Sequence, residues 1–169
     1  MTRRTTLSLP LPLLPFVLAL AGCAGAASGA SAQEAARCGP AERLLVRLGL
    51  VAVAEADTID DWRSGKVVAG CRVTAAGVTT RSLRAEAEAF YQRVRDAGWT
   101  RTPDPRDAPN ESSLRFRLDD TDCLFNLYEG ILLGTAAEVE VSTRAAARAG
   151  EERYNLLVQC IPAMDARPR

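Results

Sequence analysis

The sequence predicts an α+β fold: a mainly antiparallel sheet of four to five strands covered by one long amphipathic helix, plus a short N-terminal helix. Three observations predict this class. Apolar residues recur at helical spacing over residues 82–97, and they alternate with polar residues in several shorter segments. The order of the segments is helix, strand, helix and then mainly strands. Because a sheet must bury at least one face, we expect the 82–97 helix to cover it.

The short helix is predicted to begin at Gly39-Pro40, because proline is tolerated in the first helical turn. Three leucines share one face of it, and a glycine follows where it can end: Leu44, Leu45, Leu48 and Gly49. From Lys66 to Thr74 the apolar period changes to two, which predicts a strand. Its inward residues are Val67, Ala69, Cys71 and Val73.

The long helix is the clearest element, with apolar residues at spacings of 4, 3, 4 and 3: Leu83, Ala87, Phe90, Val94 and Ala97. Thr80 or Ser82 is expected to cap its first turn. Gly98 is placed to adopt a left-handed conformation at the end, so that Trp99 folds back on Val94.

The C-terminal half predicts further strands, separated by a proline-rich loop at 100–113 and a turn at Asp119–Asp122. The segments with alternating side chains are 114–118, 123–127, 138–141 and 154–160. The third of them depends on Val139 and Val141, which alternate with Glu138 and Glu140. Residues 144–152 are expected to form a hairpin connection or a short helical turn.

Residues 1–22 have the layout of an export signal, with two arginines followed by an apolar stretch of about 15 residues. A spanning helix needs about 20, and three prolines interrupt this one, so a stable membrane span is not expected. The run Leu20-Ala21-Gly22-Cys23 resembles the lipobox of bacterial lipoproteins. That resemblance implies a diacylglyceryl thioether on Cys23 and cleavage before it. The alternative is an ordinary signal peptide with a chance cysteine, and the choice between general and twin-arginine secretion stays open.

The chain therefore divides into a lipoprotein signal peptide (1–22), a lipid-anchored flexible linker (23–37), one disulfide-containing α+β domain (38–163) and a disordered tail (164–169). Ala24 follows the lipobox cysteine, where an aspartate often means inner-membrane retention. The resemblance thus implies the outer membrane, facing the periplasm, in a host with two membranes. In other hosts it implies the outer face of the cytoplasmic membrane. The phrase FYQRVRDAGW is similar to segments of small uncharacterised bacterial envelope domains, and the similarity carries no activity with it.

Four cysteines follow Cys23, and an even number in an exported chain predicts two disulfides. They are Cys38, Cys71, Cys123 and Cys160. Three pairings are open. A plain meander would place Cys123 and Cys160 at opposite ends of parallel strands, which disfavours the pairing of sequence neighbours. We expect no metal, because the chain has no histidine and no CxxC pair.

The composition excludes several classes of function. Loss of the signal leaves 19 basic against 21 acidic residues, so no basic footprint for nucleic acid is expected. The absence of histidine removes histidine-based triads, and no GxSxG, Walker A or GxGxxG pattern occurs. We therefore predict no catalytic residues, no cofactor and no enzymatic activity.

Carboxylates support the one enzymatic alternative, a carboxylate-dependent envelope hydrolase. Asp119, Asp120 and Asp122 lie between two predicted strands, where they could hold calcium, but aspartates are also common turn residues. Asp60 and Asp61 lie beside Trp62, and a solvated loop is the favoured interpretation there.

Two features are candidate partner contacts. Arg115 and Arg117 point the same way from one strand, although exposed arginines usually form a solvated face. The segment Gly130–Gly134 carries Ile131, Leu132 and Leu133 between glycines, and it either caps the core or contacts a partner. The sequence thus predicts a non-catalytic binding or structural-support domain that is attached to the membrane through Cys23 and has an envelope protein as its candidate partner.

Overall fold

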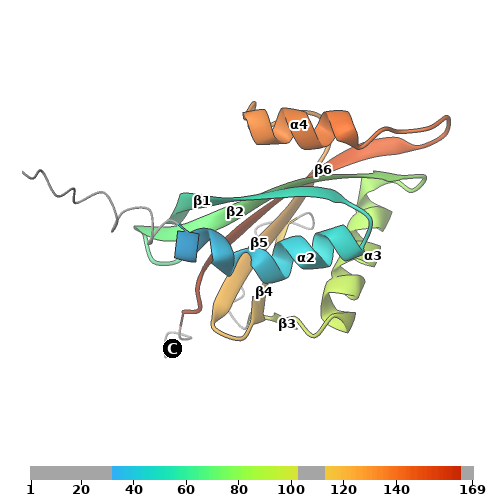
Figure 1. The fold of residues 1–169 in the computed structure, drawn as a ribbon. Helices are drawn as coiled ribbons and strands as arrows, with labels where there is room; N and C mark the ends of the chain where they lie inside the picture. The colour runs from blue at the N-terminus through green and yellow to red at the C-terminus, as the bar shows by residue number, and fades with distance from the viewer. Residues whose placement is uncertain (1–31, 103–112, 165–169) are drawn as a thin grey trace, which may run out of the picture.

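A computed structural model describes residues 32–102 and 113–164 and shows an α+β fold built on one open antiparallel sheet (Figure 1). The sheet has six strands in the order β1-β2-β6-β5-β4-β3, more than the four to five expected. A helical run at 32–37 precedes the other elements. These are α2 (Gly39–Arg47), β1 (Val51–Asp61), β2 (Lys66–Thr79), α3 (Leu83–Asp96), β3 (Thr100–Arg101), β4 (Ser113–Leu118), β5 (Thr121–Tyr128), α4 (Ala136–Arg144) and β6 (Glu152–Pro162). No helix in the described ranges is long and apolar enough to cross a membrane.

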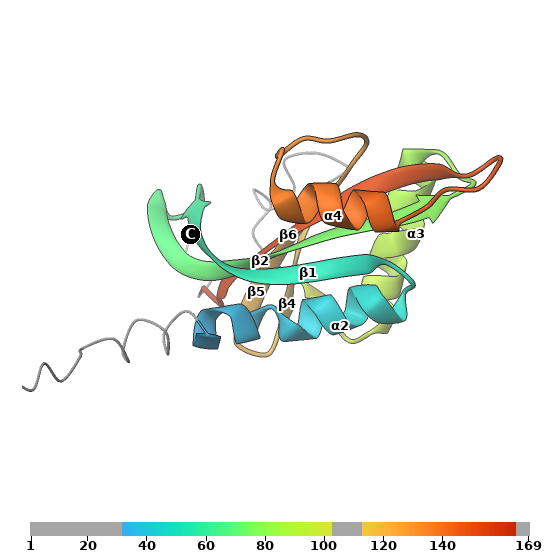
Figure 2. The ribbon, with the colours of Figure 1, turned by 45° about the horizontal axis from the view of Figure 1, so that its top comes forward.

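The expectation that one long helix covers the sheet is wrong, because helices lie on both faces. Helices α2 and α3 pack on one face, and α4 lies on the other (Figures 1 and 2). The faces follow the alternation of β2, where Ala75 belongs to the large core and Ala76 packs with Val141 of α4. We call these the α2–α3 face and the α4 face.

The α2–α3 face carries an aromatic core. Phe90 of α3 contacts Phe125 of the sheet at a ring-centroid distance of 5.9 Å, and Tyr91 stacks on Phe116 at 5.7 Å. Trp99 meets Phe125 edge to face at 5.5 Å. These side chains are at most 3% exposed. The predicted end of the helix is present: Gly98 has φ +91°, and the Trp99 N–H donates to the Val94 carbonyl. Burial of large aromatic side chains makes this face the main source of hydrophobic stabilisation.

Strand β1 is absent from the sequence prediction. It pairs with β2 along its whole length, from Val51 opposite Ala76 to Asp61 opposite Lys66. Alanine occupies the first three of its positions toward the α2–α3 face, of which Ala52 and Ala54 pack against the core. Alanine has low strand propensity, so the segment lacks the β-branched signal on one of its faces.

The predicted strand at 138–141 is wrong, since this segment lies within helix α4. The Thr135 hydroxyl accepts a hydrogen bond from the Glu138 N–H, which caps the first turn. Val141 is buried on the sheet, whereas Val139 is 51% exposed. Four alternating residues fit either period, and the cap and the alanines before them favour the helix.

Strand β2 is longer than predicted, and its first residues do not face a core. Val67 is 70% exposed, and Ala69 is also exposed, which corrects the expectation that both point inward. The ladder with β6 begins only at Cys71, so the preceding residues pair with β1 alone. Cys71 and Val73 are buried as expected.

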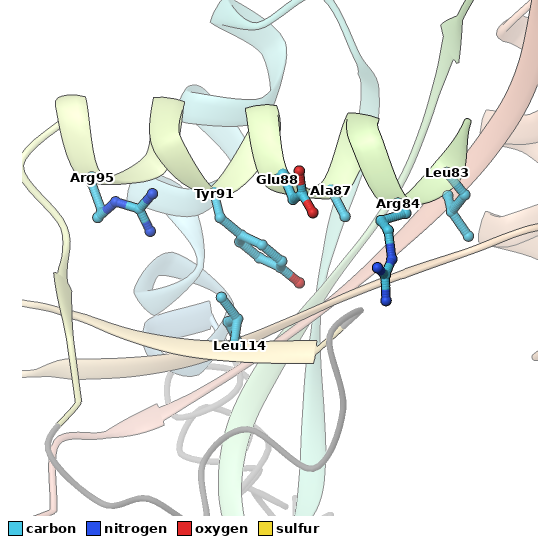
Figure 3. A pocket seen from close by; sticks show the side chains of 7 residues that line it. All are labelled: Leu83, Arg84, Ala87, Glu88, Tyr91, Arg95 and Leu114. Atoms are coloured by element: carbon cyan, nitrogen blue, oxygen red, sulfur yellow. The ribbon is translucent and has the colours of Figure 1, made fainter. Parts of the chain in front are cut away.

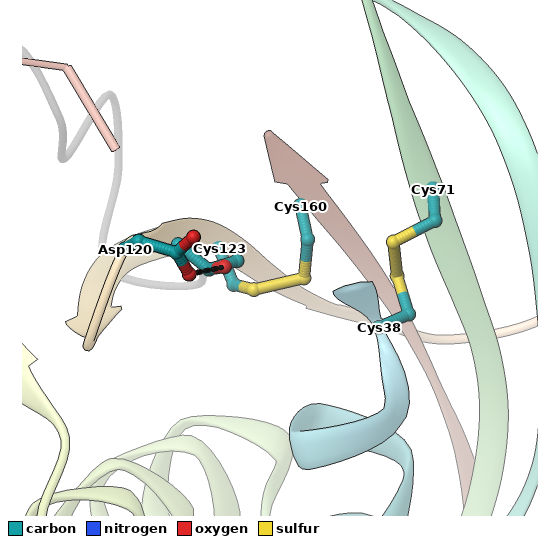
Figure 4. The surroundings of a disulfide bond; sticks show 6 residues. Cys38, Cys71, Asp120, Cys123 and Cys160 are labelled. Carbon is teal, nitrogen blue, oxygen red and sulfur yellow. Dashed lines mark hydrogen bonds between the residues drawn. A yellow bond between two sulfur atoms is a disulfide. The ribbon is translucent and has the colours of Figure 1, made fainter. Parts of the chain in front are cut away.

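The four cysteines form two disulfides, Cys38–Cys71 and Cys123–Cys160 (Figure 4). The expectation that cysteines adjacent in sequence do not pair is wrong. Because 138–141 is a helix rather than a strand, β6 lies directly beside β5 and antiparallel to it. Cys123 and Cys160 are then register partners.

Candidate partner-binding surface

The apolar segment 130–134 connects β5 to α4 and is exposed. The relative exposure of Ile131 is 55%, of Leu132 63% and of Leu133 37%. Val139 of α4, at 51%, adds a fourth exposed apolar side chain nearby. We call these four residues the apolar loop surface. Side chains of this kind are normally buried, so a group of them on one loop is a candidate contact site.

Glu138 fixes the backbone of this loop from inside the protein. Its carboxylate is fully buried and accepts hydrogen bonds from the N–H groups of Leu132 (2.9 Å), Leu133 (2.9 Å) and Gly134 (2.7 Å). The Tyr128 hydroxyl donates a fourth, at 2.8 Å. Three consecutive N–H groups directed at one anion form a nest, which stabilises its charge.

The electrostatics of Glu138 agree with this role. Burial by itself raises the pKa of this carboxyl. The hydrogen bonds from the Leu132 N–H, the Tyr128 hydroxyl and the two other backbone donors lower the pKa by more, so it lies below its usual value. Burial and the adjacent carboxylate raise the pKa of Tyr128, which therefore stays protonated and donates. The loop is held by an ionised acid.

Both ends of the loop are also fixed. Gly130 and Gly134 have φ values of +73° and +66°, which other residues adopt only with strain. The Gly130 carbonyl accepts a hydrogen bond from the Asn155 amide, and the Asn155 Oδ1 accepts one from the Ser142 hydroxyl at 2.8 Å. The exposed side chains thus extend from a backbone whose conformation is determined before any partner binds.

A cavity of about 280 Å³ lies beside the loop. Its walls come from the loop, α4 and β6: Gly130, Ile131, Val139, Ser142, Thr143, Arg153 and Asn155. The Arg153 guanidinium donates to the Ser142 carbonyl, which connects β6 to α4 beneath it. The apolar loop surface therefore combines protruding side chains with an adjacent hollow, a shape that suits another protein surface.

Arg115 and Arg117, unlike the side chains of the apolar loop surface, form ion pairs within the domain. Arg115 is only 3% exposed, and its guanidinium lies 3.8 Å from Asp61 Oδ1. Arg117 binds Asp122 with both ends of its guanidinium, at 2.6 and 2.9 Å. The expectation that both arginines point outward, as candidate partner contacts or as a solvated face, is wrong for Arg115, which is buried; both guanidinium groups pair with buried carboxylates.

A third arginine connects these two pairs. Arg63 donates to Asp61 at 3.1 Å and to Asp122 at 3.2 Å. Burial raises the pKa of each carboxyl, but hydrogen bonds and positive charge lower it below its usual value. At Asp61 they come from Ser64 and Arg63. At Asp122 they come from Arg117, the Met164 N–H and Arg63. We call these five residues, Asp61, Arg63, Arg115, Arg117 and Asp122, the charged cluster.

The remaining candidate acids, Asp60, Asp119 and Asp120, do not form one cluster. Asp60 is exposed on β1, next to buried Asp61, and Trp62 is 44% exposed. Asp119 has φ +52° in the β4–β5 turn, and Asp120 makes an exposed contact of 3.8 Å with Arg37. Within the described ranges, one group of potential metal ligands comes together. It consists of three cysteines, Cys38, Cys71 and Cys160. All three are in disulfides.

A cavity of about 560 Å³ lies between α3 and β4 and was not predicted (Figure 3). Tyr91 and Leu114 contribute its apolar wall, and Arg84, Glu88 and Arg95 extend from α3 around it. Among the described residues that line it, Glu88 is the one carboxylate. General acid–base hydrolysis of glycosides needs two carboxylates facing one bond, and the described part of the lining supplies one.

The start of the described chain and the apolar loop surface lie at opposite ends of β5. Arg37 meets Asp120 just before β5 begins, whereas the loop follows Tyr128, where β5 ends. A strand of this length spans about 25 Å. Cys23, the predicted lipid attachment, lies outside the described residues, as do most of the predicted linker and all but the first residue of the predicted tail.

Comparison with family models, with curated proteins and with solved structures finds no match. The candidate surface therefore depends on geometry alone. Sequence reasoning selected Ile131, Leu132 and Leu133 but missed Glu138, although the spacing Thr135-x-x-Glu138 is that of a capping box.

Proposed function

We propose that this protein is a lipid-anchored component of the bacterial cell envelope whose domain binds another envelope protein through the apolar loop surface, without catalysis. The observation that carries this proposal is the fixed conformation of an exposed apolar loop. A buried carboxylate holds three of its backbone N–H groups, so the exposed side chains extend from a defined backbone. Preorganisation of this kind lowers the entropy lost on binding.

The position of the surface supports a partner other than the anchoring membrane. The chain enters the domain near Asp120, about 25 Å from the loop along β5. A tether at Cys23 then leaves the apolar loop surface free to point away from the bilayer. In a host with two membranes, we place the domain in the periplasm, attached to the outer membrane; in other hosts, on the outer face of the cytoplasmic membrane.

Site-specific photo-crosslinking in cells of the host tests the binding proposal. A photoreactive residue at Leu132 is expected to crosslink one discrete envelope protein, and the same residue at Val67 is not. Val67 is the matched control because it is 70% exposed and apolar but lies on the β1–β2 hairpin. Replacing Ile131 and Leu133 with serine is expected to remove the Leu132 adduct. Equal adducts from both positions, or an adduct that survives the serine variant, would contradict the proposal.

Lipid attachment is tested separately. Cys23→Ser is expected to abolish incorporation of labelled fatty acid and to leave unprocessed precursor or released protein. Two or more acyl chains anchor stably, because each buried methylene contributes about 0.8 kcal/mol. A Cys23→Ser protein that is processed and fractionates with membranes like the parent would show that the anchor lies elsewhere, whatever the outcome of the crosslinking.

A further inference from the structure

Cys160 has a cysteine neighbour on each adjacent strand. It is the register partner of Cys71 in the β2–β6 ladder and of Cys123 in the β5–β6 ladder. Register partners on antiparallel strands direct their side chains to the same face. The three residues thus form a row across β2, β6 and β5, although Cys160 is bonded to Cys123 alone, at a Cα–Cα distance of 4.1 Å.

The two disulfides approach each other closely. The sulfur atoms of Cys38, Cys71 and Cys160 all lie within 4.8 Å of one another, and Figure 4 shows the two bridges as neighbours. All four cysteines are fully buried among apolar side chains. A thiolate generated at one bridge would therefore meet the sulfur of the other before it met solvent.

We propose that Cys160 is an exchange position through which the two disulfides rearrange when one of them is opened. An external dithiol first reduces Cys38–Cys71 and is itself oxidised to a disulfide. The Cys71 thiolate then attacks Cys160 Sγ, so that the Cys71–Cys160 bond forms and the Cys123–Cys160 bond breaks. The electron pair leaves with Cys123 Sγ, which takes up the proton released by Cys71.

The rearrangement changes which elements are covalently joined. The original bridges connect α2 to β2 and β5 to β6. After exchange, β2 is joined to β6, while Cys38 and Cys123 are thiols. Helix α2, on the side from which the predicted tether enters, is then no longer bonded to the sheet, yet the central strands stay crosslinked. The domain thus contains a redox-sensitive connection between its core and its N-terminal helix.

Partial reduction of the full chain, with Cys23 replaced by serine so that four cysteines remain, tests the exchange. The protein is treated with limiting dithiothreitol, thiols are trapped with N-ethylmaleimide after acid quenching, and disulfide-linked peptides are mapped by mass spectrometry. We expect the Cys71–Cys160 peptide pair to accumulate as a third species, together with alkylated Cys38 and Cys123. If only the two original bridges are found at every degree of reduction, the exchange does not occur.

A pair of two-cysteine variants provides the matched control in the same background. Cys38→Ala/Cys123→Ala leaves Cys71 and Cys160, which we expect to oxidise to a disulfide in the folded protein. Cys71→Ala/Cys160→Ala leaves Cys38 and Cys123, which are not register partners of each other, and we expect both to remain thiols. Two free thiols in a folded Cys38→Ala/Cys123→Ala protein would overturn the proposal. If either variant fails to fold, the partial-reduction map of the four-cysteine protein decides alone.

Discussion

The two faces of the sheet are held by different physics. The α2–α3 face is an aromatic and aliphatic core, in which burial of apolar area supplies the stabilisation. Among the described residues, the α4 face has a small apolar cluster of Ala76, Val141 and Ala145, with Val51 and Val53 beside it. Elsewhere that face carries the charged cluster at one end and the carboxylate of Glu138 near the other.

The α2–α3 face supplies most of the stability, whereas the α4 face determines the conformation of particular backbone segments. Apolar burial tolerates small displacements, because it is proportional to area and has no direction. Hydrogen bonds to buried carboxylates are directional, and leaving one unmade is costly. The α4 face therefore fixes particular backbone segments, and the apolar loop surface is one of them. We expect substitutions on the two faces to differ in kind as well as in size.

The largest loss of stability is expected on the α2–α3 face. Phe125 contacts Phe90, Trp99 and Phe116 and is fully buried. Phe125→Ala is expected to lower the free energy of unfolding by about 3–5 kcal/mol, measured by urea denaturation. Val67→Ala, on the exposed hairpin, is expected to change it by less than about 0.5 kcal/mol. Comparable values for the two variants would refute the assignment of this core.

The charged cluster gives the next effect. Asp122→Ala removes the carboxylate that Arg63 and Arg117 share, and we expect a loss of about 3 kcal/mol, since broken buried pairs leave uncompensated charge. Asp120→Ala, in the same hairpin but exposed, is expected to cost less than about 1 kcal/mol. An Asp122→Ala protein as stable as the parent would mean that the cluster contributes little to the α4 face.

The pH dependence distinguishes the faces again. The folded-state pKa values of Asp61, Asp122 and Glu138 lie below their usual values, so the unfolded chain binds their protons first as pH falls. Their stabilisation is complete above about pH 5 and is lost as pH decreases through the unfolded and then the folded pKa values. Urea denaturation between pH 7 and pH 3 is expected to show this decline, and Asp122→Asn should flatten it. Phe125→Leu should lower the free energy of unfolding at every pH without changing its slope against pH. An unchanged slope in Asp122→Asn would contradict the role given to this carboxylate.

The smallest expected effect on stability belongs to the surface itself. Leu132→Ser changes a side chain that is 63% exposed, so the free energy of unfolding should move by less than about 0.5 kcal/mol. The same variant is expected to weaken partner capture. A loss of stability above about 2 kcal/mol would instead assign the loop to the core.

The sequence predicts the α2–α3 face well because that face is periodic. The spacing from Leu83 to Val94, the Gly98 stop and the alternation in β6 each report local geometry, and burial of Phe90, Phe125 and Tyr154 follows. The disulfide count was also predictable from the even number of cysteines that follow Cys23. The pairing was not, because it depends on which strand lies beside β6.

The α4 face was harder to predict for a physical reason. Arg63, Arg115 and Arg117 look like surface residues in any local window. Each pairs with a carboxylate on another element, Arg115 with Asp61 and the other two with Asp122. The two valines of α4 have the spacing of a strand, and in the helix they lie on different sides, with Val141 buried and Val139 exposed. Glu138 was missed because its function depends on the three backbone N–H groups that precede the helix, and these carry no side-chain signal.

The claim that Glu138 holds the apolar loop surface in place is tested most directly by amide hydrogen exchange at Leu132, Leu133 and Gly134, measured by NMR. In the parent protein these N–H groups are expected to be protected, although the side chains of Leu132 and Leu133 are exposed. In Glu138→Ala, which removes the acceptor, their protection should disappear while Phe125 and Val158 of the sheet stay protected. Exchange of the three amides at the rate of an unstructured loop in the parent, or unchanged protection in Glu138→Ala, would contradict the account.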